Sequence, residues 1–361
     1  GDNASGLRRS GHGVRWVGLL RGHSMGLSLP LGMAAGSADN YHPVMAFFAI
    51  AIALLLEQVR PLAADHPAAT GLRRWLRLVG RNVDAGGVQH GWLAWLLAVG
   101  VPTLGVIAVH WFLAWLGGWP LVLVWSVVVL YLTLGFRQFS HHFTGIRDAL
   151  EAADEERARV LLARWQQVDG SSVPRSEIVR HVIEYSVLAA HRHVFGVLAW
   201  FCFMAVLGLG PAGAVFYRNA EYAARYWRRK SEAPDQPSSA ALRSVADAAW
   251  YVIDWLPARM TALGFAIVGS FEDAIDAWRQ HAARFANGND GVILAATAGA
   301  IGVRLGGASL RPLAVDIEGQ PVPNPGALAG DGLPGEAART PHFTQVVGLV
   351  WRTVALWLLL L

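Results

Sequence analysis

Long apolar runs alternate with arginine-rich polar segments along this chain. The runs cover residues 44–56, 92–116, 121–136, 249–270 and 346–361. Because roughly 20 apolar residues cross the hydrocarbon core of a bilayer, the pattern predicts an all-α, polytopic integral membrane protein with about five membrane helices. Helical periodicity with mixed charge at 148–165 and 271–286 predicts cytoplasmic or amphipathic helices between them.

The segment 181–217 fits two arrangements. It is apolar on either side of a Gly-Pro cluster at residues 208–213, and a basic stretch follows it. If both flanks face the cytoplasm, the segment enters the membrane and returns, with the Gly-Pro cluster as the turn of a re-entrant hairpin. Irregular backbone at membrane depth needs protein or a cavity around it. A simple span is the competing interpretation, and both stay open.

The two ends of the chain carry their own expectations. Residues 1–44 are rich in Gly and Ser without an apolar period, which predicts a disordered leader. Met25, Met33 and Met45 are alternative starts, so this leader need not belong to the natural protein. We expect a membrane domain over residues 45–307, a Pro/Gly-rich connector over 308–345 and a C-terminal membrane helix over 346–361.

The composition supports the membrane prediction. The chain is 54% hydrophobic and 16% charged, whereas soluble domains carry about 25% charged residues. Lys230 is the only lysine, so arginines carry the positive charge. Their clusters beside apolar runs, such as residues 73–81, indicate a cytoplasmic segment and membrane lipid as partner, with no nucleic acid. Cys202 is the single cysteine, which excludes a disulfide or a cysteine metal site within one chain.

The run 249–270 carries ionisable residues near its middle. Asp254 and Arg259 are costly in a bilayer unless they are paired or face a wet cavity, so this helix is expected to line something. Residues five apart point about 140° from one another on a helix, so the two side chains face different sides. Pro257 is expected to free a backbone carbonyl. In the alternative, Asp254 lies at headgroup depth beside interfacial tryptophans.

Histidine and acid spacing raises the question of a metal. His181, Glu184, Leu188 and His191 follow one another at intervals of three or four residues and share a helix face, which suits a divalent metal or proton exchange. The alternative is histidines that only cap or snorkel at the membrane surface. We assign no metal ligand.

A Gly- and Asn-rich segment, residues 287–291, precedes a helix with small residues four apart. A helix N-terminus attracts phosphate, and Arg304 can add a bidentate contact. An ordinary turn is the alternative. The sequence contains no GxxxxGK[ST] or HExxH motif, and its GxSxG match, GHSMG at 22–26, lies in the Gly- and Ser-rich leader without a predicted strand before it or helix after it, so a P-loop nucleotide site or a hydrolase has no support.

Four segments stand out together: GPAGAVFYR at 210–218, DWLPARMTAL at 254–263, NDG at 289–291 and AGAIGVRLGG at 298–307. In this order they resemble the CobD/CbiB family of cobalamin biosynthesis. The resemblance implies a multi-pass protein of the bacterial inner membrane. It also implies adenosylcobinamide-phosphate synthase activity, in which an ATP-dependent C–N ligase joins aminopropanol or its phosphate to adenosylcobyric acid, with Mg²⁺ as a second cofactor and a corrinoid as substrate.

Matched positions supply the expected site. The resemblance implies catalytic roles for Glu184, Arg218 and Arg259, with Glu184 as base or Mg²⁺ ligand. Tyr217, Asn289 and Arg304 are expected to bind substrate or phosphate.

Residues 57–67 and 190–196 depart from the family pattern. There the chain resembles AmpE, a membrane protein linked to β-lactamase induction, so the alternative function is non-enzymatic signalling. A transporter is a third interpretation, without support from an internal repeat.

Overall fold

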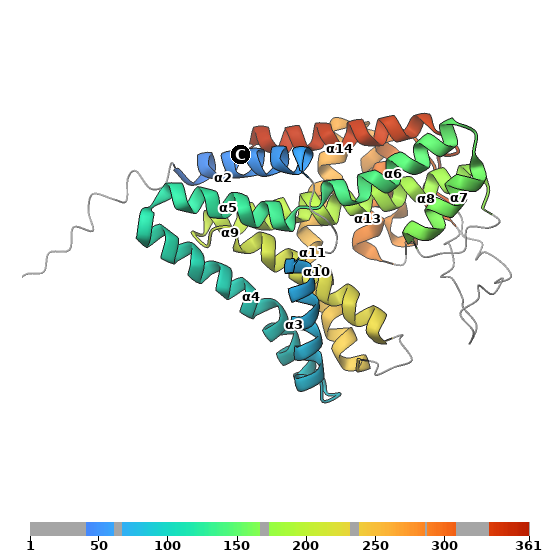
Figure 1. Ribbon diagram of the computed structural model, residues 1–361. Coiled ribbons are helices and arrows are strands. Elements are labelled where there is room, and N and C mark those ends of the chain that lie inside the picture. Colours follow the sequence, from blue (N-terminus) through green and yellow to red (C-terminus); the bar gives the residue numbers. More distant parts are fainter. Residues whose placement is uncertain are drawn as a thin grey trace, which may run out of the picture. The chain divides into compact units, whose positions relative to one another are not determined.

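The computed structural model describes residues 41–60, 67–166, 173–231, 238–285, 287–307 and 332–360 (Figure 1). These residues belong to one compact unit, Asn40–Leu361. The leader up to residue 40 and the connector residues 308–331 lie outside them, and the expectations for those segments stay predictions.

Helices make up the regular structure of the described residues. In chain order they are α2 (Tyr41–Val59), α3 (Pro67–Val83), α4 (Val88–Gly117), α5 (Trp119–Thr133), α6 (Phe136–Glu151), α7 (Glu155–Gln166), α8 (Arg175–Ala190), the π-helical turn η1 (His191–Phe195), α9 (Gly196–Val206), α10 (Ala212–Ser231), α11 (Ala240–Val268), α12 (Phe271–His281), the 3₁₀ turn η2 (Ala282–Arg284), α13 (Gly288–Ile301) and α14 (Pro341–Leu360). Extended pairing in these parts of the chain is confined to an isolated bridge between Val303 and Glu336.

Three of the predicted apolar runs, 92–116, 249–270 and 346–361, coincide with helices long enough to span a membrane, whereas the runs 44–56 and 121–136 form shorter helices. Four helical segments of the described chain are long and apolar enough to cross a bilayer: Val88–Gly117, Arg175–Val206, Ala240–Val268 and Pro341–Leu360. Two apolar helices, Val44–Val59 and Trp119–Thr133, are shorter. The chain is an all-α polytopic membrane protein, as predicted. Of the segment left open between re-entrant and spanning, residues 181–206 lie in the continuous Arg175–Val206 helix, which has the length of a span, and a turn at the Gly-Pro cluster separates it from α10.

The turn expected between the second and third apolar runs is present. Gly118 joins α4 to α5 with a φ of 65°, a conformation that favours glycine, and α5 has a proline in its first turn. The last apolar helix, α14, starts at Pro341 rather than at residue 346.

The mixed-charge segment 148–165 folds as two helices instead of one. α6 ends at Glu151, Ala153 takes a φ of 58°, and α7 begins at Glu155. The Asp154 carboxylate accepts a hydrogen bond from the Arg157 backbone N–H at 3.0 Å, and Glu155 and Glu156 occupy the first turn of α7. An N-cap acid followed by two acids is a helix-start signal strong enough to interrupt a helical periodicity.

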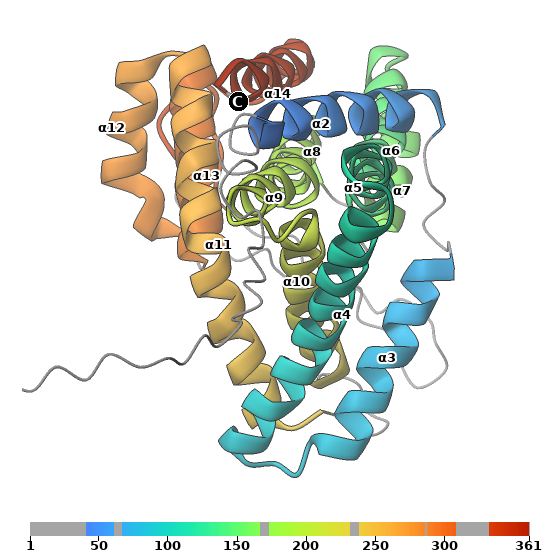
Figure 2. The same ribbon diagram turned by 90° about the vertical axis from the view of Figure 1, so that its left-hand side faces the viewer.

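Helix α10 contacts α4, α9 and α11, and in Figure 2 it runs between α4 and α11. Its approach to α9 depends on Gly213, where a Cβ would overlap the backbone carbonyl of Trp200. Small residues also allow α13 to approach α12, because a Cβ at Gly299 would overlap the Asp273 carbonyl. α13 also contacts α8 and α11, and α11 contacts α10, so these four helices lie together.

Candidate functional site

Helix α11 carries a proline at its centre and compensates for it. Pro257 has no N–H, so the carbonyl of Ile253, four residues earlier, loses its helical donor. Trp200 of α9 donates its indole N–H to that carbonyl at 3.0 Å. The freed carbonyl predicted from the sequence therefore binds α9 to α11.

Asp254 lies one residue beyond that carbonyl and is fully buried. Its Oδ1 lies 2.8 Å from His191 Nε2 and accepts a 2.7 Å hydrogen bond from the Tyr217 hydroxyl. His191 Nδ1 lies 2.9 Å from Thr261 Oγ1. We call Asp254, His191, Tyr217 and Thr261 the Asp254 cluster. It joins three helical segments through a carboxylate that would otherwise be costly in a membrane protein.

Tyr217 reaches this cluster across a glycine. A Cβ at Gly196 would overlap the Tyr217 ring, so the ring fits only against bare backbone. Burial, and then the neighbouring Asp254 carboxylate, raise the pKa of the Tyr217 hydroxyl well above its usual value. The hydroxyl therefore stays protonated and donates to Asp254.

The π-helical turn η1 sends two consecutive side chains to different helices. His191 faces Asp254 of α11, whereas the Arg192 guanidinium donates to both carboxylate oxygens of Asp290 in α13, each at 2.7 Å. π-turns inside helices are frequent at functional sites because the extra residue changes the direction of the side chains. Residues 190–196, which depart from the family pattern, therefore form a hydrogen bond with DWLPARM and an ion pair with NDG, two of the segments that match it.

The N-terminus of α13 is occupied by side chains of the protein itself. The Asn287 side chain caps the helix by accepting from the Asn289 N–H at 3.3 Å, and its Nδ2 donates to Asp290 at 2.9 Å. A Cβ at Gly291 would overlap the carbonyl of Ala282, so this glycine serves helix packing. The first turn of α13, where the sequence predicted an anion site at 287–291, therefore carries the carboxylate of Asp290.

Arg259 and Asn289 are brought together as the motif match implies. Arg259 Nη1 donates to Asn289 Oδ1 at 3.1 Å and to the Trp255 carbonyl at 2.8 Å, and the guanidinium lies 4.0 Å from the centre of the Trp255 ring. Arg259 is half-buried and faces α13, whereas Asp254 faces α10 and η1. The predicted divergence of the two side chains on α11 is confirmed.

Glu184 connects α8 to the AGAIGVRLGG segment. Its Oε1 accepts from the Gly306 backbone N–H at 2.7 Å and from Arg180 at 2.8 Å. Its Oε2 lies 3.7 Å from His181 Nδ1, beyond hydrogen-bond distance. Glu184 thus holds the segment that shows the most specific family match.

Arg218 and Arg304 lie apart from these contacts. Arg218 pairs with the buried Glu221 at 3.2 Å, and Arg225 pairs with the same carboxylate at 3.3 Å. Burial lowers the pKa of Arg218, opposed by the charge of Glu221. Arg304 is exposed, and its backbone N–H bonds the Glu336 carbonyl at 2.7 Å.

Four residues of the site were missed or misassigned from the sequence: His191, Arg192, Thr261 and Asp290. His191 had been grouped with His181 and Glu184, but its partners lie on α11. A helical period cannot show a π-turn. The signal available for Asp290 was its position in the first turn of a helix within NDG.

Each carboxylate of the site has a protein partner. Asp290 is bound by Arg192, Glu184 by Arg180, and Asp254 by His191, while Asp254 Oδ2 is buried without a hydrogen-bond partner. Across the described ranges, no group of three or more His, Cys, Asp or Glu side chains is placed to hold a metal.

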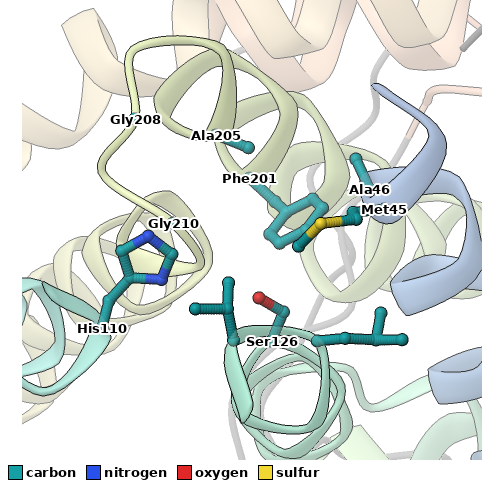
Figure 3. A pocket seen from close by; sticks show the side chains of 10 residues that line it. Met45, Ala46, His110, Ser126, Phe201, Ala205, Gly208 and Gly210 are labelled. Atoms are coloured by element: carbon teal, nitrogen blue, oxygen red, sulfur yellow. The ribbon is translucent and has the colours of Figure 1, made fainter. Parts of the chain in front are cut away.

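A separate pocket lies among α2, α4, α5 and α9 and the turn before α10 (Figure 3). Its lining is mostly apolar, with His110 and Ser126 as the polar side chains, and Gly210 approaches the His110 ring. Its volume of about 30 Å³ is the space of roughly one water molecule. It therefore cannot hold a nucleotide or a corrinoid.

Known proteins similar to this chain are cobalamin biosynthesis proteins. The sequence pattern of the CobD/Cbib protein family matches residues 25–325. The chain is 30% identical over 275 residues to "Cobalamin biosynthesis protein CobD" of Stutzerimonas stutzeri, covering 76% of this chain and 81% of that protein. The protein of the same name from Chromobacterium violaceum is 31% identical over 282 residues, covering 78% of this chain and 80% of that protein. No solved structure matches. Nothing in these comparisons supports the AmpE-like alternative.

Proposed function

The chain belongs to the CobD/CbiB family of cobalamin biosynthesis proteins, and from this membership we propose that it is an adenosylcobinamide-phosphate synthase. The observation that supports the proposal is that matched segments distant in sequence contact one another in pairs. Tyr217 bonds Asp254, Arg259 bonds Asn289, and Glu184 bonds Gly306. These contacts fix the matched segments relative to one another, as an enzyme site built from them would require.

The reaction forms an amide bond between the propionate carboxyl carbon of adenosylcobyric acid and the nitrogen of aminopropanol or its phosphate. The carboxylate oxygen leaves with a phosphoryl or adenylyl group of ATP, and the amine gives up protons. ATP supplies the activation that a carboxylate needs before an amine can attack it. The protein's part is to position the two reactants and to stabilise the charge on the phosphates.

Arginines would hold the phosphates of ATP. Arg259, half-buried beside Asn289, is the first candidate, whereas Arg218 is paired with Glu221 and Arg304 is exposed within AGAIGVRLGG, both apart from that contact. Guanidinium groups bind phosphate oxygens in pairs, which gives both charge and orientation. Any Mg²⁺ would enter bound to ATP, since the carboxylates of this site already have partners.

Glu184 is proposed as the acceptor of the amine proton. Its Oε1 is engaged by Gly306 and Arg180, which leaves Oε2 as the basic oxygen. Replacement of Glu184 by alanine would remove both the proton acceptor and the oxygen that binds the Gly306 N–H. Replacement by glutamine would remove only the proton acceptor.

The proposed location is the bacterial inner membrane, with the site at its cytoplasmic face, where ATP and the corrinoid are available. The basic segments 73–81 and 225–230 favour that orientation.

Complementation tests the proposal. The full chain is expressed in a bacterial host that lacks its own adenosylcobinamide-phosphate synthase, cobyric acid is supplied, and cobalamin-dependent growth is scored. We expect growth with the wild-type chain and with Arg279→Ala, an exposed arginine of α12, and none with Arg259→Ala at equal membrane abundance. Absence of growth from well-inserted wild-type protein would contradict the proposed activity.

A further inference from the structure

Helix α3 carries a strongly one-sided distribution of charge. It contains Arg73, Arg74, Arg77 and Arg81 and no acidic residue. All four arginines are exposed, while Leu76 and Val79 on the opposite side are buried. The helix is therefore amphipathic, with a purely cationic outer face, which we call the α3 arginine face.

The apolar side of α3 is attached to a candidate membrane span. Trp75 donates its indole N–H to the Ala98 carbonyl of α4 at 3.3 Å, and the two helices lie side by side (Figures 1 and 2). α4 covers Val88–Gly117 and is one of the helices long enough to cross a bilayer. α3 is thus fixed along the N-terminal part of a candidate membrane span, whose first residue, Val88, follows Arg81 closely in the chain.

Charge on this face is poorly balanced within the protein. Arg73 donates to the Tyr222 hydroxyl at 3.0 Å, whereas Arg74, Arg77 and Arg81 have no ion pair with any described residue. The acid that follows the helix, Asp84, is engaged by the backbone N–H and hydroxyl of Ser239. Arginines four residues apart repel one another, so this arrangement gains most from an anion outside the protein.

An exposed apolar side chain lies among these charges. Leu78 follows Arg77 and lies one turn beyond Arg74, and it is 53% exposed. A leucine between arginines suits a helix lying at a membrane interface, where the apolar group meets acyl chains and the guanidinium groups meet headgroups. A nucleic acid or a free nucleotide offers no counterpart for this leucine.

We propose that the α3 arginine face binds the headgroups of anionic phospholipids, such as phosphatidylglycerol, at the cytoplasmic leaflet. Juxtamembrane arginine clusters are attracted to anionic leaflets, and a guanidinium can bind two phosphate oxygens. The lipid fixes α3 against the membrane and so supports α4 and α10, which α3 contacts through Trp75 and Arg73. This inference is independent of the ligase activity.

Thermal unfolding in an uncharged detergent tests the inference. Phosphatidylglycerol or phosphatidylcholine is added at equal concentrations to the purified full chain. We expect phosphatidylglycerol to raise the Tm by about 3 °C or more and phosphatidylcholine to leave it unchanged, because a ligand that binds only the folded state stabilises it. The triple variant R74Q/R77Q/R81Q should lose most of the rise.

A matched control removes the same charge elsewhere. R157A/R164A/R279A, three exposed arginines of α7 and α12, should keep the phosphatidylglycerol effect. Equal effects of the two lipids, or a full effect in R74Q/R77Q/R81Q, would overturn the proposal. A rise of the same size with inorganic phosphate or ATP, lost in R74Q/R77Q/R81Q, would assign the face to a soluble phosphate compound instead.

A second measurement tests the proposal on the wild-type chain, in case the triple variant does not fold. High salt screens headgroup charge, so the phosphatidylglycerol effect on the wild-type chain should fall sharply as NaCl rises from 0.05 to about 0.5 M. A salt-independent effect would overturn the proposal without any substitution.

Discussion

His191 Nε2 lies 2.8 Å from Asp254 Oδ1, and both side chains are completely buried. The contact joins η1, within one helix long enough to span a membrane, to α11, within another. Tyr217 and Thr261 complete the same cluster. Each member supplies a partner that the others need, so the cluster is a fixed point on which the surrounding site depends.

Removal of Asp254 should destabilise the protein strongly. Asp254→Ala removes the oxygen shared by the buried His191 and Tyr217, which lie 3.3 Å from each other, and a buried polar group left unsatisfied costs about 1–3 kcal/mol. We expect a fall in the free energy of unfolding of that size, measured by denaturant or SDS titration in mixed micelles. Asp247→Ala is the control, because it removes the other acidic residue of α11. It breaks exposed pairs with Arg228 and Arg243 and should cost under about 1 kcal/mol. Equal costs would show that the Asp254 cluster is not the anchor described.

Gly213 should not tolerate alanine, whereas Gly100 should. At Gly213 a Cβ overlaps a backbone carbonyl of α9, which cannot move aside without separating α9 from α10, but at Gly100 of α4 no atom lies within 4 Å. Gly213→Ala should reduce folded protein several-fold in fluorescence-detected gel filtration. Gly100→Ala should leave it unchanged or raise stability by up to about 1 kcal/mol. A normal profile for Gly213→Ala would mean that α9 and α10 are less closely packed than described.

Reversal of the ion pair between Arg192 and Asp290 should be partly tolerated. Arg192→Asp or Asp290→Arg places like charges together across η1 and α13, and each should lower stability by about 2 kcal/mol. The double variant restores attraction and should recover about half of the summed loss, measured as a coupling energy in a double-mutant cycle. Strict additivity of the two single changes would contradict a direct pair.

Glu184→Gln and Glu184→Ala should differ in a diagnostic way. The amide keeps an oxygen for the Gly306 N–H, so Glu184→Gln should leave the Tm within a few degrees while lowering kcat by about 100-fold or more. Glu184→Ala should lower both. If Glu184→Gln keeps full activity, Glu184 positions the loop and accepts no proton.

Helix type and position followed well from the sequence, because long apolar runs and the turn at Gly118 have direct physical consequences. Gly213, expected in a turn, lies instead in α10, where it allows close contact with α9. The break between α6 and α7 was missed, because the helical periodicity continues through residues 152–154. α6 ends there at Glu151, and Asp154 caps the start of α7. The apolar run 121–136 was expected to span the membrane, but it forms the helix Trp119–Thr133, which is shorter than a span.

The candidate site was only partly accessible from the sequence. Contacts of Arg259 with Asn289 and of Tyr217 with Asp254 join residues of matched motifs, so the resemblance pointed to them. His191 and Arg192 were hidden because a π-turn sets their directions and because their partners lie 63 and 98 residues away. Tertiary ion pairs of that kind leave no local pattern.

Direct conversion of substrate tests the central claim. Purified full-length chain in nanodiscs is incubated with adenosylcobyric acid, ATP and aminopropanol phosphate, and corrinoids are identified by mass spectrometry while ATP consumption is followed. We predict an amide product that carries the amine, formed in proportion to the ATP consumed and absent from Arg259→Ala. Folded wild-type protein that consumes no ATP and forms no amide, beside an active synthase of the family that does both, would contradict the account.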